Sequence, residues 1–314
     1  MSSSAPRVAV VGATGVVGRV TLGLLREREY ADVTAFASVR SAGTTVDGLA
    51  VEEATPERLA AGEFDVCLFS VGTDASRELV PATAASGALC VDKSAAFRLD
   101  PGTPLVVPEV NGHRALENTG IVANPNCCSI PLSIALAPLR DAAGLRRVRV
   151  ATYQSVSGAG SRALERLRQE QPGEHDLRMD WSFDGTEFDE ETKIREETRK
   201  ILELPDLPVS ATCVRVPVPV GHAEAVWVQT EEPLPAAEAE RVLSAAPGIR
   251  LETAPTPGQA AGTDDVLVGR VRQDTAEEHG LALFVACDNL RKGAALNAVQ
   301  IAELVLVARA PAAR

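Results

Sequence analysis

A short apolar run followed directly by closely spaced glycines restricts the possible folds of this chain more than any other feature. Arg7 to Val11 predicts a buried strand, and Gly12-Ala-Thr-Gly-Val-Val-Gly18 follows it without a gap. An amphipathic pattern then predicts a helix to about Arg28. Glycines at these positions allow a tight turn and let the backbone approach an anion at the helix N-terminus. This order favours a dinucleotide-binding unit, with an ordinary strand-to-helix loop as the alternative.

The turn after the second predicted strand indicates which dinucleotide fits. Val33 to Ala37 predicts that strand, and Ser38, Arg40 and Ser41 follow it. Enzymes that use NAD usually place an acidic residue here for the ribose 2′-hydroxyl, whereas an arginine accommodates a 2′-phosphate. The sequence therefore predicts NADP as the cofactor. The alternative is that Arg40 is a solvated loop residue.

Strands and helices alternate over the first 126 residues, which predicts an α/β fold with a Rossmann-type, doubly wound parallel sheet. Further strands are expected at Phe64 to Val71, Leu89 to Asp92, Pro104 to Val107 and Thr119 to Ala123. The predicted cofactor contacts in the turns of this unit are Gly12, Thr14, Gly15, Val16, Val17, Gly18, Ser38, Arg40, Ser41, Ser70 and Gly72.

Beyond Pro138 the pattern changes to runs of strands with fewer helices, which predicts a second, mixed α+β domain. Val214 to Val220 alternates valine with other residues, and Pro217 and Pro219 favour an edge strand there. The other expected strands are 148–156, 225–230, 266–271 and 281–287; helices are expected at 190–202 and 292–309, and 170–190 is expected to form a long surface connection.

Two adjacent cysteines follow the turn Asn124-Pro-Asn126. Pro131 opens an apolar run, so Cys127 is predicted to lie where a strand turns into a helix N-terminus. Unpaired backbone N–H groups and the helix dipole lower a thiol pKa at such a position, which suits a nucleophile. The alternative is that Cys127 and Cys128 only fill a core.

The composition excludes several classes of protein. A net charge of −12 argues against a general nucleic-acid or anionic-membrane binder. The six cysteines and four histidines show no metal-ligand spacing, so no metal site is predicted. The first residues do not resemble a secretory signal, and no apolar run reaches the length of a membrane span. These features favour a reducing cytoplasm.

Nine segments spread along the chain form a recognisable pattern. They are GATGVVG (12–18), RSAG (40–43), VPEVN (107–111), ANPNCCSI (123–130), TYQSVSGAG (152–160), ETRKIL (197–202), ATCVRVPVPVGHAEAV (211–226), VLVGRVRQD (266–274) and DNLRKGAALNAVQIAE (288–303). With these segments, nearly the whole chain resembles the aspartate-β-semialdehyde dehydrogenase family, in which they occur in the same order. The related N-acetylglutamyl-phosphate reductases are less similar around the cysteines.

The resemblance implies that NADPH reduces β-aspartyl phosphate to aspartate semialdehyde through a cysteine thioester, with release of phosphate. It implies Cys127 as nucleophile, preceded by Asn126, His222 as acid/base and Gln154 as a residue that positions the acyl group. It implies Arg215 at the substrate carboxylate, Glu190 near the amino group, and Arg98 and Lys193 at the phosphate. The resemblance also places Ser157, Gly158 and Asn289 at the cofactor.

The resemblance further implies a dinucleotide-binding domain of residues 1–126, completed by a C-terminal helix within 290–314, and a catalytic and dimerisation domain of residues 127–289. A homodimer is expected, and whether dimers pair into a tetramer is left open. The expected partners are a small-molecule substrate and phosphate, with neither nucleic acid nor membrane.

Three departures from the family pattern leave other substrates open. Lys93 and Ala95 stand where the family usually has Asn and Ser, Cys128 replaces a common hydroxyl residue, and the connection at 173–189 is shorter. A paralogue that acts on a related acyl phosphate in a specialised pathway is one alternative. A non-catalytic homologue that binds nucleotide is another.

Overall fold

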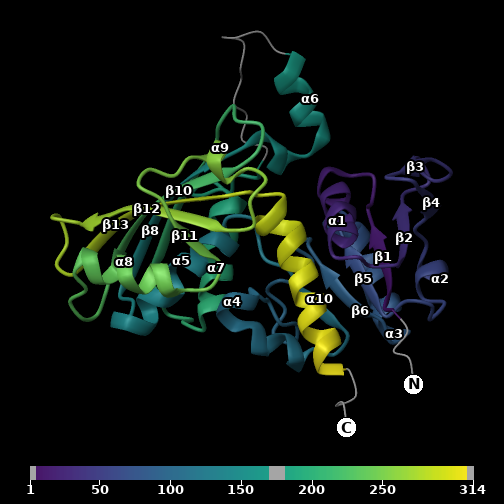
Figure 1. The fold of residues 1–314 in the computed structure, drawn as a ribbon, viewed down its shortest axis with the longest axis horizontal. Helices are drawn as coiled ribbons and strands as arrows, with labels where there is room; N and C mark the ends of the chain where they lie inside the picture. The colour runs from purple at the N-terminus through teal and green to yellow at the C-terminus, as the bar shows by residue number, and fades with distance from the viewer. Residues whose placement is uncertain (1–4, 170–180, 310–314) are drawn as a thin grey trace. The chain divides into compact units, whose positions relative to one another are not determined.

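The structure is a computed structural model that describes residues 5–169 and 181–309. It divides into two compact units, drawn in Figure 1. The first unit contains the chain up to Pro125 and again from Ala294, and the second unit contains Asn126–Gly293. In the described part of the chain, no helix has both the length and the apolar character that crossing a bilayer requires.

A sheet forms the centre of the first unit. Its strands are β1 (Arg7–Val11), β2 (Asp32–Ala37), β3 (Thr45–Val46), β4 (Leu49–Glu53), β5 (Val66–Phe69), β6 (Leu89–Asp92) and β7 (Ile121–Ala123). Their order among the described residues is β3-β4-β2-β1-β5-β6-β7, and every pair is parallel except β3 with β4. The doubly wound parallel sheet predicted from the sequence is confirmed.

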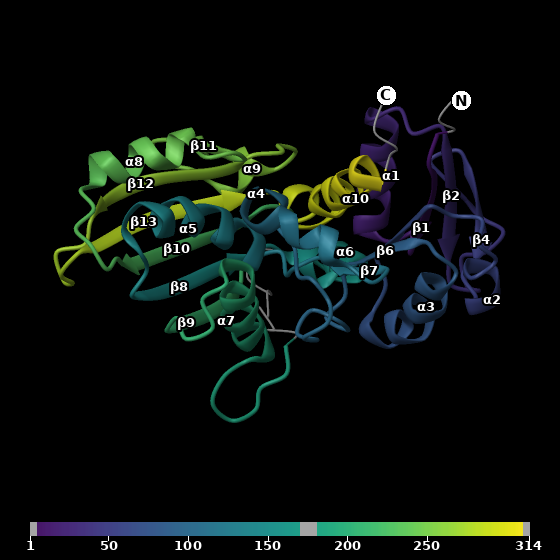
Figure 2. The ribbon, with the colours of Figure 1, turned by 90° about the horizontal axis from the view of Figure 1, so that it is seen from below.

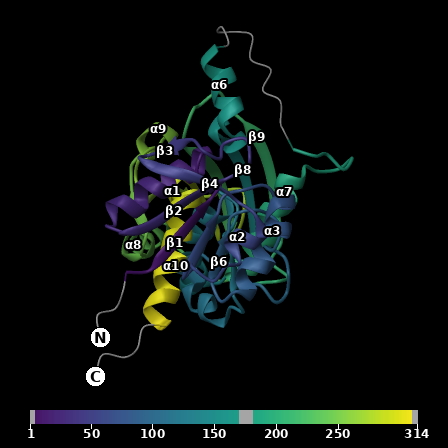
Figure 3. The same ribbon diagram turned by 90° about the vertical axis from the view of Figure 1, so that its right-hand side faces the viewer.

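Helices cover both faces of this sheet because its strands are apolar on both sides. Val8 and Val10 pack with helices α1 (Val16–Glu27) and α10 (Leu296–Arg309), whereas Ala9 and Val11 pack with α2 (Pro56–Leu59) and α3 (Thr73–Ala85). Figure 3 shows α1 and α10 on one side of the strands and α2 and α3 on the other. The helical segments of the unit are α1 (Val16–Glu27), α2 (Pro56–Leu59), α3 (Thr73–Ala85), α4 (Pro108–Asn111), the 3₁₀ segment Gly112–Glu117 and α10 (Leu296–Arg309).

The order of the strands fixes where a ligand can bind to this unit. The chain moves outward in one direction from β1 through β2 to β4, and then in the other direction through β5, β6 and β7. The switch point therefore lies between β1 and β5. Ligands of open α/β sheets bind outside the carboxyl ends of the strands at such a point. Gly12 follows β1 and Ser70 follows β5, so both predicted turns lie at this crevice.

The second unit is built on a mixed sheet in which Figure 2 shows the strands side by side. Its strands are β8 (Arg147–Gln154), β9 (Val209–Arg215), β10 (His222–Gln229), β11 (Ile249–Leu251), β12 (Val266–Gln273) and β13 (Gly280–Cys287), in the order β11-β12-β13-β10-β8-β9 among the described residues. Its helical segments are α5 (Ser129–Ala143), a 3₁₀ turn (Val156–Ala159), α6 (Ser161–Gln169), α7 (Asp189–Leu202), α8 (Ala236–Ala245), α9 (Pro257–Ala260) and a π-helical turn (Arg291–Ala295) that leads into α10.

Strand register places chemically active side chains on one face of this second sheet. Gln154 pairs with Arg215, and the β10/β8 register, continued by one residue, brings His222 opposite Gln154. Thr152 pairs with both Cys213 and Glu224 in the next row. Because successive side chains in a strand point to opposite faces, all of these residues share the buried face.

Several predicted elements differ from the structure at their ends. The strand expected at Val214 to Val220 is wrong in its bounds, because β9 runs from Val209 and ends at Arg215, before the prolines; the predicted edge position is confirmed. Leu105 forms only an isolated bridge with Ala123 instead of a strand at 104–107. The final α-helix begins at Leu296, and residues 170–180 of the predicted surface connection lie outside the described residues.

Candidate active site

The sulfur of Cys127 lies 3.2 Å from Nε2 of His222, although 95 residues separate them in the sequence. Cys127 is half-buried in the turn that precedes α5, and His222 begins β10 and is 1% exposed. The predicted nucleophile and the predicted acid/base therefore lie within hydrogen-bonding distance in the second unit.

The hydrogen bonds around His222 decide which ring nitrogen carries the proton. The backbone N–H of Ser155 donates to Nδ1 at 2.9 Å, so Nδ1 is an acceptor. The proton of the neutral ring is then on Nε2 and points at the Cys127 sulfur. In this arrangement, His222 is set to donate a hydrogen bond to a thiolate and a proton to an oxyanion that forms beside it.

The surroundings of Cys127 favour its thiolate. Its pKa is held well below the ordinary value, first because the Cys128 thiol hydrogen-bonds to it; His222 and the Arg215 guanidinium add to this effect, and burial opposes it. Burial raises the pKa of Cys128 well above its ordinary value, so Cys128 stays a thiol and can donate. The two sulfurs and a His222 ring nitrogen lie within 4.8 Å of one another.

Glu190 joins two of the predicted residues through one carboxylate oxygen. Its Oε1 accepts from Asn126 Nδ2 and from Gln154 Nε2, both at 2.9 Å. Glu197, two turns further along the same face of α7, accepts from the backbone N–H of Asn126 at 2.6 Å. All four residues are buried, so the charge-assisted bonds to Asn126 fix the turn that carries Cys127.

Arg215 and Gly158 lie against this centre. One terminal nitrogen of Arg215 donates to the Ser155 carbonyl at 3.0 Å, and the guanidinium is 6% exposed. A Cβ on Gly158 would lie 2.9 Å from that nitrogen and 3.3 Å from the His222 ring. Gly158 is thus needed for the close approach of its backbone to both groups.

Asn289 fixes the loops around His222. Its Oδ1 accepts from the Ser155 and Ser157 hydroxyls at 3.0 and 3.2 Å and from the Gly221 N–H at 2.9 Å. Its Nδ2 donates to Ser157 at 2.9 Å. The predicted cofactor contacts Asn289 and Ser157 are therefore bonded to each other in this structure.

Lys193 lies at the margin of the cluster. Its Nζ bonds to Asp189 at 2.7 Å and lies 3.6 Å from Glu190 Oε2. The lysine side chain is 28% exposed, so its charge is accessible to a ligand.

In the first unit, the glycine turn is as tight as its sequence predicts. Gly12 has φ of +87°, and a Cβ there would lie 2.3 Å from the Ser70 carbonyl oxygen. A Cβ on Gly18 would lie 2.1 Å from the Gly12 carbonyl oxygen, so that position also excludes a side chain. Gly15, with Val16 and Val17 after it, begins helix α1, while Gly72 is the N-cap of α3.

The loop after β2 meets the glycine turn. The Thr14 hydroxyl bonds to the Ser41 hydroxyl at 3.5 Å, and Ser38 accepts the backbone N–H of Ser41 at 2.8 Å. Arg40 is exposed at the tip of this loop. Thr14, Ser38 and Ser41 are thereby brought together, with Arg40 on the same short loop.

Arg98 and Lys93 follow β6 in the first unit. Arg98 is 9% exposed and donates to the Asn124 carbonyl at 3.0 Å and the Lys93 carbonyl at 2.7 Å. The Lys93 ammonium donates to the Thr21 hydroxyl on α1 at 3.2 Å, and burial lowers its pKa to about 7. Lys93, which stands where the family usually has Asn, therefore directs its amino group at α1, the helix that follows the glycine turn.

Sequence reasoning missed several residues of the second-unit site. The Ser155 N–H decides which ring nitrogen of His222 carries the proton, and Glu197 accepts the backbone N–H of Asn126. The Trp181 ring lies against the Arg215 guanidinium. Glu224 is 1% exposed, and burial raises its pKa well above the ordinary value, which favours the neutral acid. A signal for Glu224 was present, because it follows His222 by two residues on the same strand face.

Comparison with known proteins places this arrangement in a family. Residues 7–118 match the family described as the NAD binding domain of semialdehyde dehydrogenase, and residues 136–292 match its dimerisation domain. The aspartate-semialdehyde dehydrogenase of Streptomyces akiyoshiensis is 44% identical, with 95% of this chain and 98% of that protein covered. That of Aquifex aeolicus is 41% identical, with 96% and 98% covered.

A solved structure extends the likeness to the fold. The aspartate semialdehyde dehydrogenase II of Vibrio cholerae, crystallised in complex with ASA, superimposes with a TM-score of 0.91 at 39% sequence identity. The match covers 98% of this chain and 100% of that one. The resemblance noted in the sequence is thereby confirmed over both units, and the chain belongs to the semialdehyde dehydrogenase family.

Proposed function

We propose that this protein is an NADP-dependent, phosphorylating aspartate-semialdehyde dehydrogenase, which reduces L-aspartyl 4-phosphate to L-aspartate 4-semialdehyde. The observation that carries the proposal is the 3.2 Å approach of the Cys127 sulfur to His222 Nε2, with Arg215 and Glu190 in the same buried cluster. The curated relatives named above have this activity in their names.

Cys127 splits the reaction into two steps. Its thiolate attacks the acyl carbon, the bond to the phosphate oxygen breaks, and a thioester with free phosphate results. A bound nicotinamide cofactor supplies the hydride for the second step. His222 then donates its Nε2 proton to the developing oxyanion, and it takes the same proton back as the carbon–sulfur bond breaks, so that the aldehyde and the Cys127 thiolate result. Proton donation of this kind contributes about 10²–10⁴-fold to a rate.

The charges around Cys127 suit a substrate with a carboxylate and an ammonium group. Arg215 can hold a carboxylate with two parallel hydrogen bonds, which a lysine cannot do. Glu190 keeps a carboxylate against Asn126, the residue before Cys127, and this carboxylate can pair with an ammonium group. Arg98 and Lys193 are the proposed phosphate contacts, with Gln154 and Asn126 positioning the acyl group.

The first unit suits the cofactor. Gly12 and Gly18 leave no room for side chains, which permits the tight turn that leads into α1, and the backbone N–H groups at the start of that helix can receive a pyrophosphate. Thr14, Gly15, Val16, Val17, Ser70 and Gly72 line the same turns, and Ser157, Gly158 and Asn289 are the proposed contacts from the second unit. Arg40 and Ser41 on the loop after β2 support NADP over NAD.

The second sheet suits self-association. Its outer face exposes Tyr153, Val214 and Trp227, which are 38%, 36% and 37% accessible. We propose that two copies pack these faces together as a homodimer. The six free cysteines and the reactive thiol suit a reducing compartment, and we propose the cytoplasm.

A steady-state assay tests the function. Aspartate semialdehyde, NADP and inorganic phosphate should give NADPH. The kcat/KM for NADP should exceed that for NAD, and the kcat/KM for aspartate semialdehyde should exceed that for N-acetylglutamate semialdehyde. Omission of phosphate should abolish sustained turnover. An enzyme that prefers N-acetylglutamate semialdehyde, or makes no NADPH from either aldehyde, would contradict the proposal.

A further inference from the structure

The indole ring of Trp181 lies directly against the guanidinium of Arg215. The Arg215 carbon is 4.6 Å from the ring centroid, which is a cation–π contact. Arg215 is 6% exposed, so the indole forms part of the wall that shields this charge. No sequence motif pointed to Trp181, because it lies in an irregular connection.

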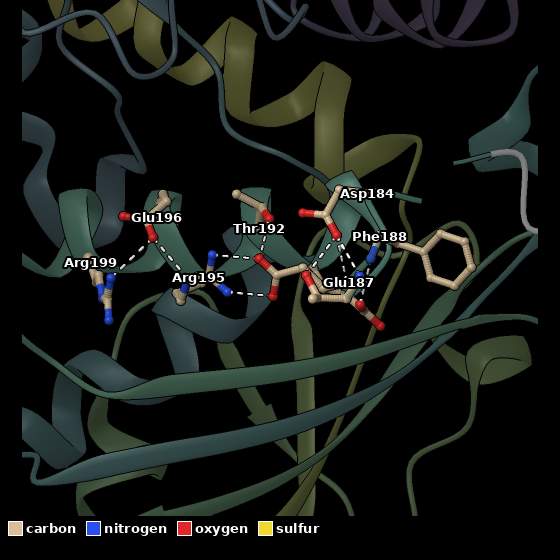
Figure 4. Close-up of polar contacts among 9 residues, drawn as sticks. Asp184, Glu187, Phe188, Thr192, Arg195, Glu196 and Arg199 are labelled. Carbon is tan, nitrogen blue, oxygen red and sulfur yellow. Dashed lines mark hydrogen bonds and ion pairs between the residues drawn. The ribbon is translucent and has the colours of Figure 1, made fainter. Parts of the chain in front are cut away.

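The loop that carries Trp181 is held by many polar contacts. Asp184 Oδ1 accepts from the Thr186 and Glu187 backbone N–H groups at 2.8 and 2.9 Å and from the Thr186 hydroxyl at 2.7 Å. The Glu187 carboxylate accepts from both terminal nitrogens of Arg195 at 2.6 and 2.7 Å. Figure 4 shows Glu187 directed toward Arg195 and Thr192 on α7.

Aromatic contacts tie the same loop to the start of α7. The Phe188 ring centroid lies 6.1 Å from that of Trp181 and 5.2 Å from that of Phe183. Phe188 is the N-cap residue of α7, the helix that carries Glu190. The position of the indole over Arg215 is therefore coupled to the position of Glu190.

Stacking on a guanidinium covers a face of the group and not its hydrogen-bonding edge. The N–H groups of arginine lie in the guanidinium plane, whereas the indole covers a face of it. A ring over that face excludes water and fixes the plane, which strengthens an ion pair made by the edge. The Ser155 carbonyl oxygen accepts a hydrogen bond from a terminal nitrogen of Arg215 at 3.0 Å, which restrains the guanidinium plane at a second point.

We propose that Trp181 is a positioning residue that orients Arg215 and thereby sets the selectivity of the site for ligands with a carboxylate. The proposal rests on the role proposed above for Arg215. It adds a determinant of substrate choice in a segment that is otherwise a surface connection.

Three variants separate this role from a structural one. Trp181→Leu removes the π face but keeps an apolar side chain, and Trp181→Phe keeps an aromatic face. Phe183→Leu is the matched control, because Phe183 is 58% exposed and contacts Phe188 in the same loop. The KM for aspartate semialdehyde should rise about tenfold in Trp181→Leu, with kcat within about twofold. Trp181→Phe should restore most of the loss.

Alkylation of Cys127 gives a readout that does not require the proposed reaction. Iodoacetate carries a carboxylate and iodoacetamide does not, so the ratio of their rates reports attraction to Arg215. Peptide mass spectrometry assigns the label to Cys127, since the other five cysteines are buried. Trp181→Leu should lower this ratio several-fold while the iodoacetamide rate stays constant.

Two results would overturn the inference. One is an unchanged iodoacetate-to-iodoacetamide ratio in Trp181→Leu. The other is an equal change in Phe183→Leu, which would show that only the folding of the loop matters. A wild-type protein without activity on aspartate semialdehyde would instead refute the proposed function, and the alkylation ratio would still decide the role of Trp181.

Discussion

At the scale of single residues, the site depends on how its side chains are held as much as on which residues they are. His222 can donate to Cys127 only because the Ser155 N–H occupies the other ring nitrogen. Arg215 is fixed by the Ser155 carbonyl and the Trp181 ring. Ser155 therefore links the imidazole and the guanidinium through its own backbone.

Gly158 gives a direct test of this close packing. Its substitution by alanine places a methyl group 2.9 Å from Arg215 and 3.3 Å from His222, and both groups must shift. We expect kcat/KM in Gly158→Ala to fall by about 10²-fold, because small misplacements of catalytic groups have effects of that size.

The matched control is Gly102→Ala, since a Cβ at Gly102 meets nothing within 4 Å. Its kcat/KM should equal that of the wild type. Equal kcat/KM in Gly158→Ala and the wild type would contradict this packing, because it would show that a methyl group fits between Gly158, Arg215 and His222.

The chemistry of the site could be read from the sequence, but only part of its electrostatics. The place of Cys127 before a helix N-terminus predicted a nucleophile with a lowered pKa, whereas His222 was found through the family resemblance. The contribution of Cys128 to the low pKa of Cys127 depends on the distance between neighbouring sulfurs in a turn. Trp181 was missed because a cation–π contact between loop and strand leaves no periodic signal in the sequence.

At the scale of elements, periodicity predicted the strands but not where they end. The alternating valines of 214–220 read as one strand, yet β9 ends at Arg215. Beyond it, the Val218 and Pro219 carbonyls accept N–H groups of Val156 and Ser157 at 2.9 and 3.1 Å. The prolines end the strand, and the segment instead supports the loop next to His222.

Register explains why residues distant in the sequence share one site. Strands β8, β9 and β10 each contribute one residue to the row Arg215, Gln154 and His222. A shift of one residue in any of these strands would move its side chain to the opposite face. Long-range pairing of this kind cannot be deduced from local periodicity. The sequence predicted β8 and most of β10, whereas β9 overlaps the strand expected at 214–220 only at Val214 and Arg215.

At the scale of the whole molecule, the outer face of the second sheet carries the proposed dimer interface. Trp227→Glu places a charge in the centre of an apolar contact, where it would be desolvated without a partner. We expect the mass measured by light scattering to fall from that of a dimer to that of a single chain. The activity per chain of Trp227→Glu should also fall if dimer formation stabilises the active site.

Val307→Glu is the control for this prediction, because Val307 is 76% exposed on α10 in the first unit. Its mass in solution should match that of the wild type. A dimer that persists in Trp227→Glu would place the interface on another surface.

The central claim is that Cys127 carries the acyl group between the two chemical steps, and a rapid-mixing experiment without phosphate tests it most directly. Aspartate semialdehyde and NADP should give a burst of about one equivalent of NADPH per active site, after which turnover stops because the thioester has no acceptor. Peptide mass spectrometry should find the aspartyl group on Cys127, and Cys127→Ala should show neither burst nor adduct. A burst that persists in Cys127→Ala, or steady turnover without phosphate, would contradict the account.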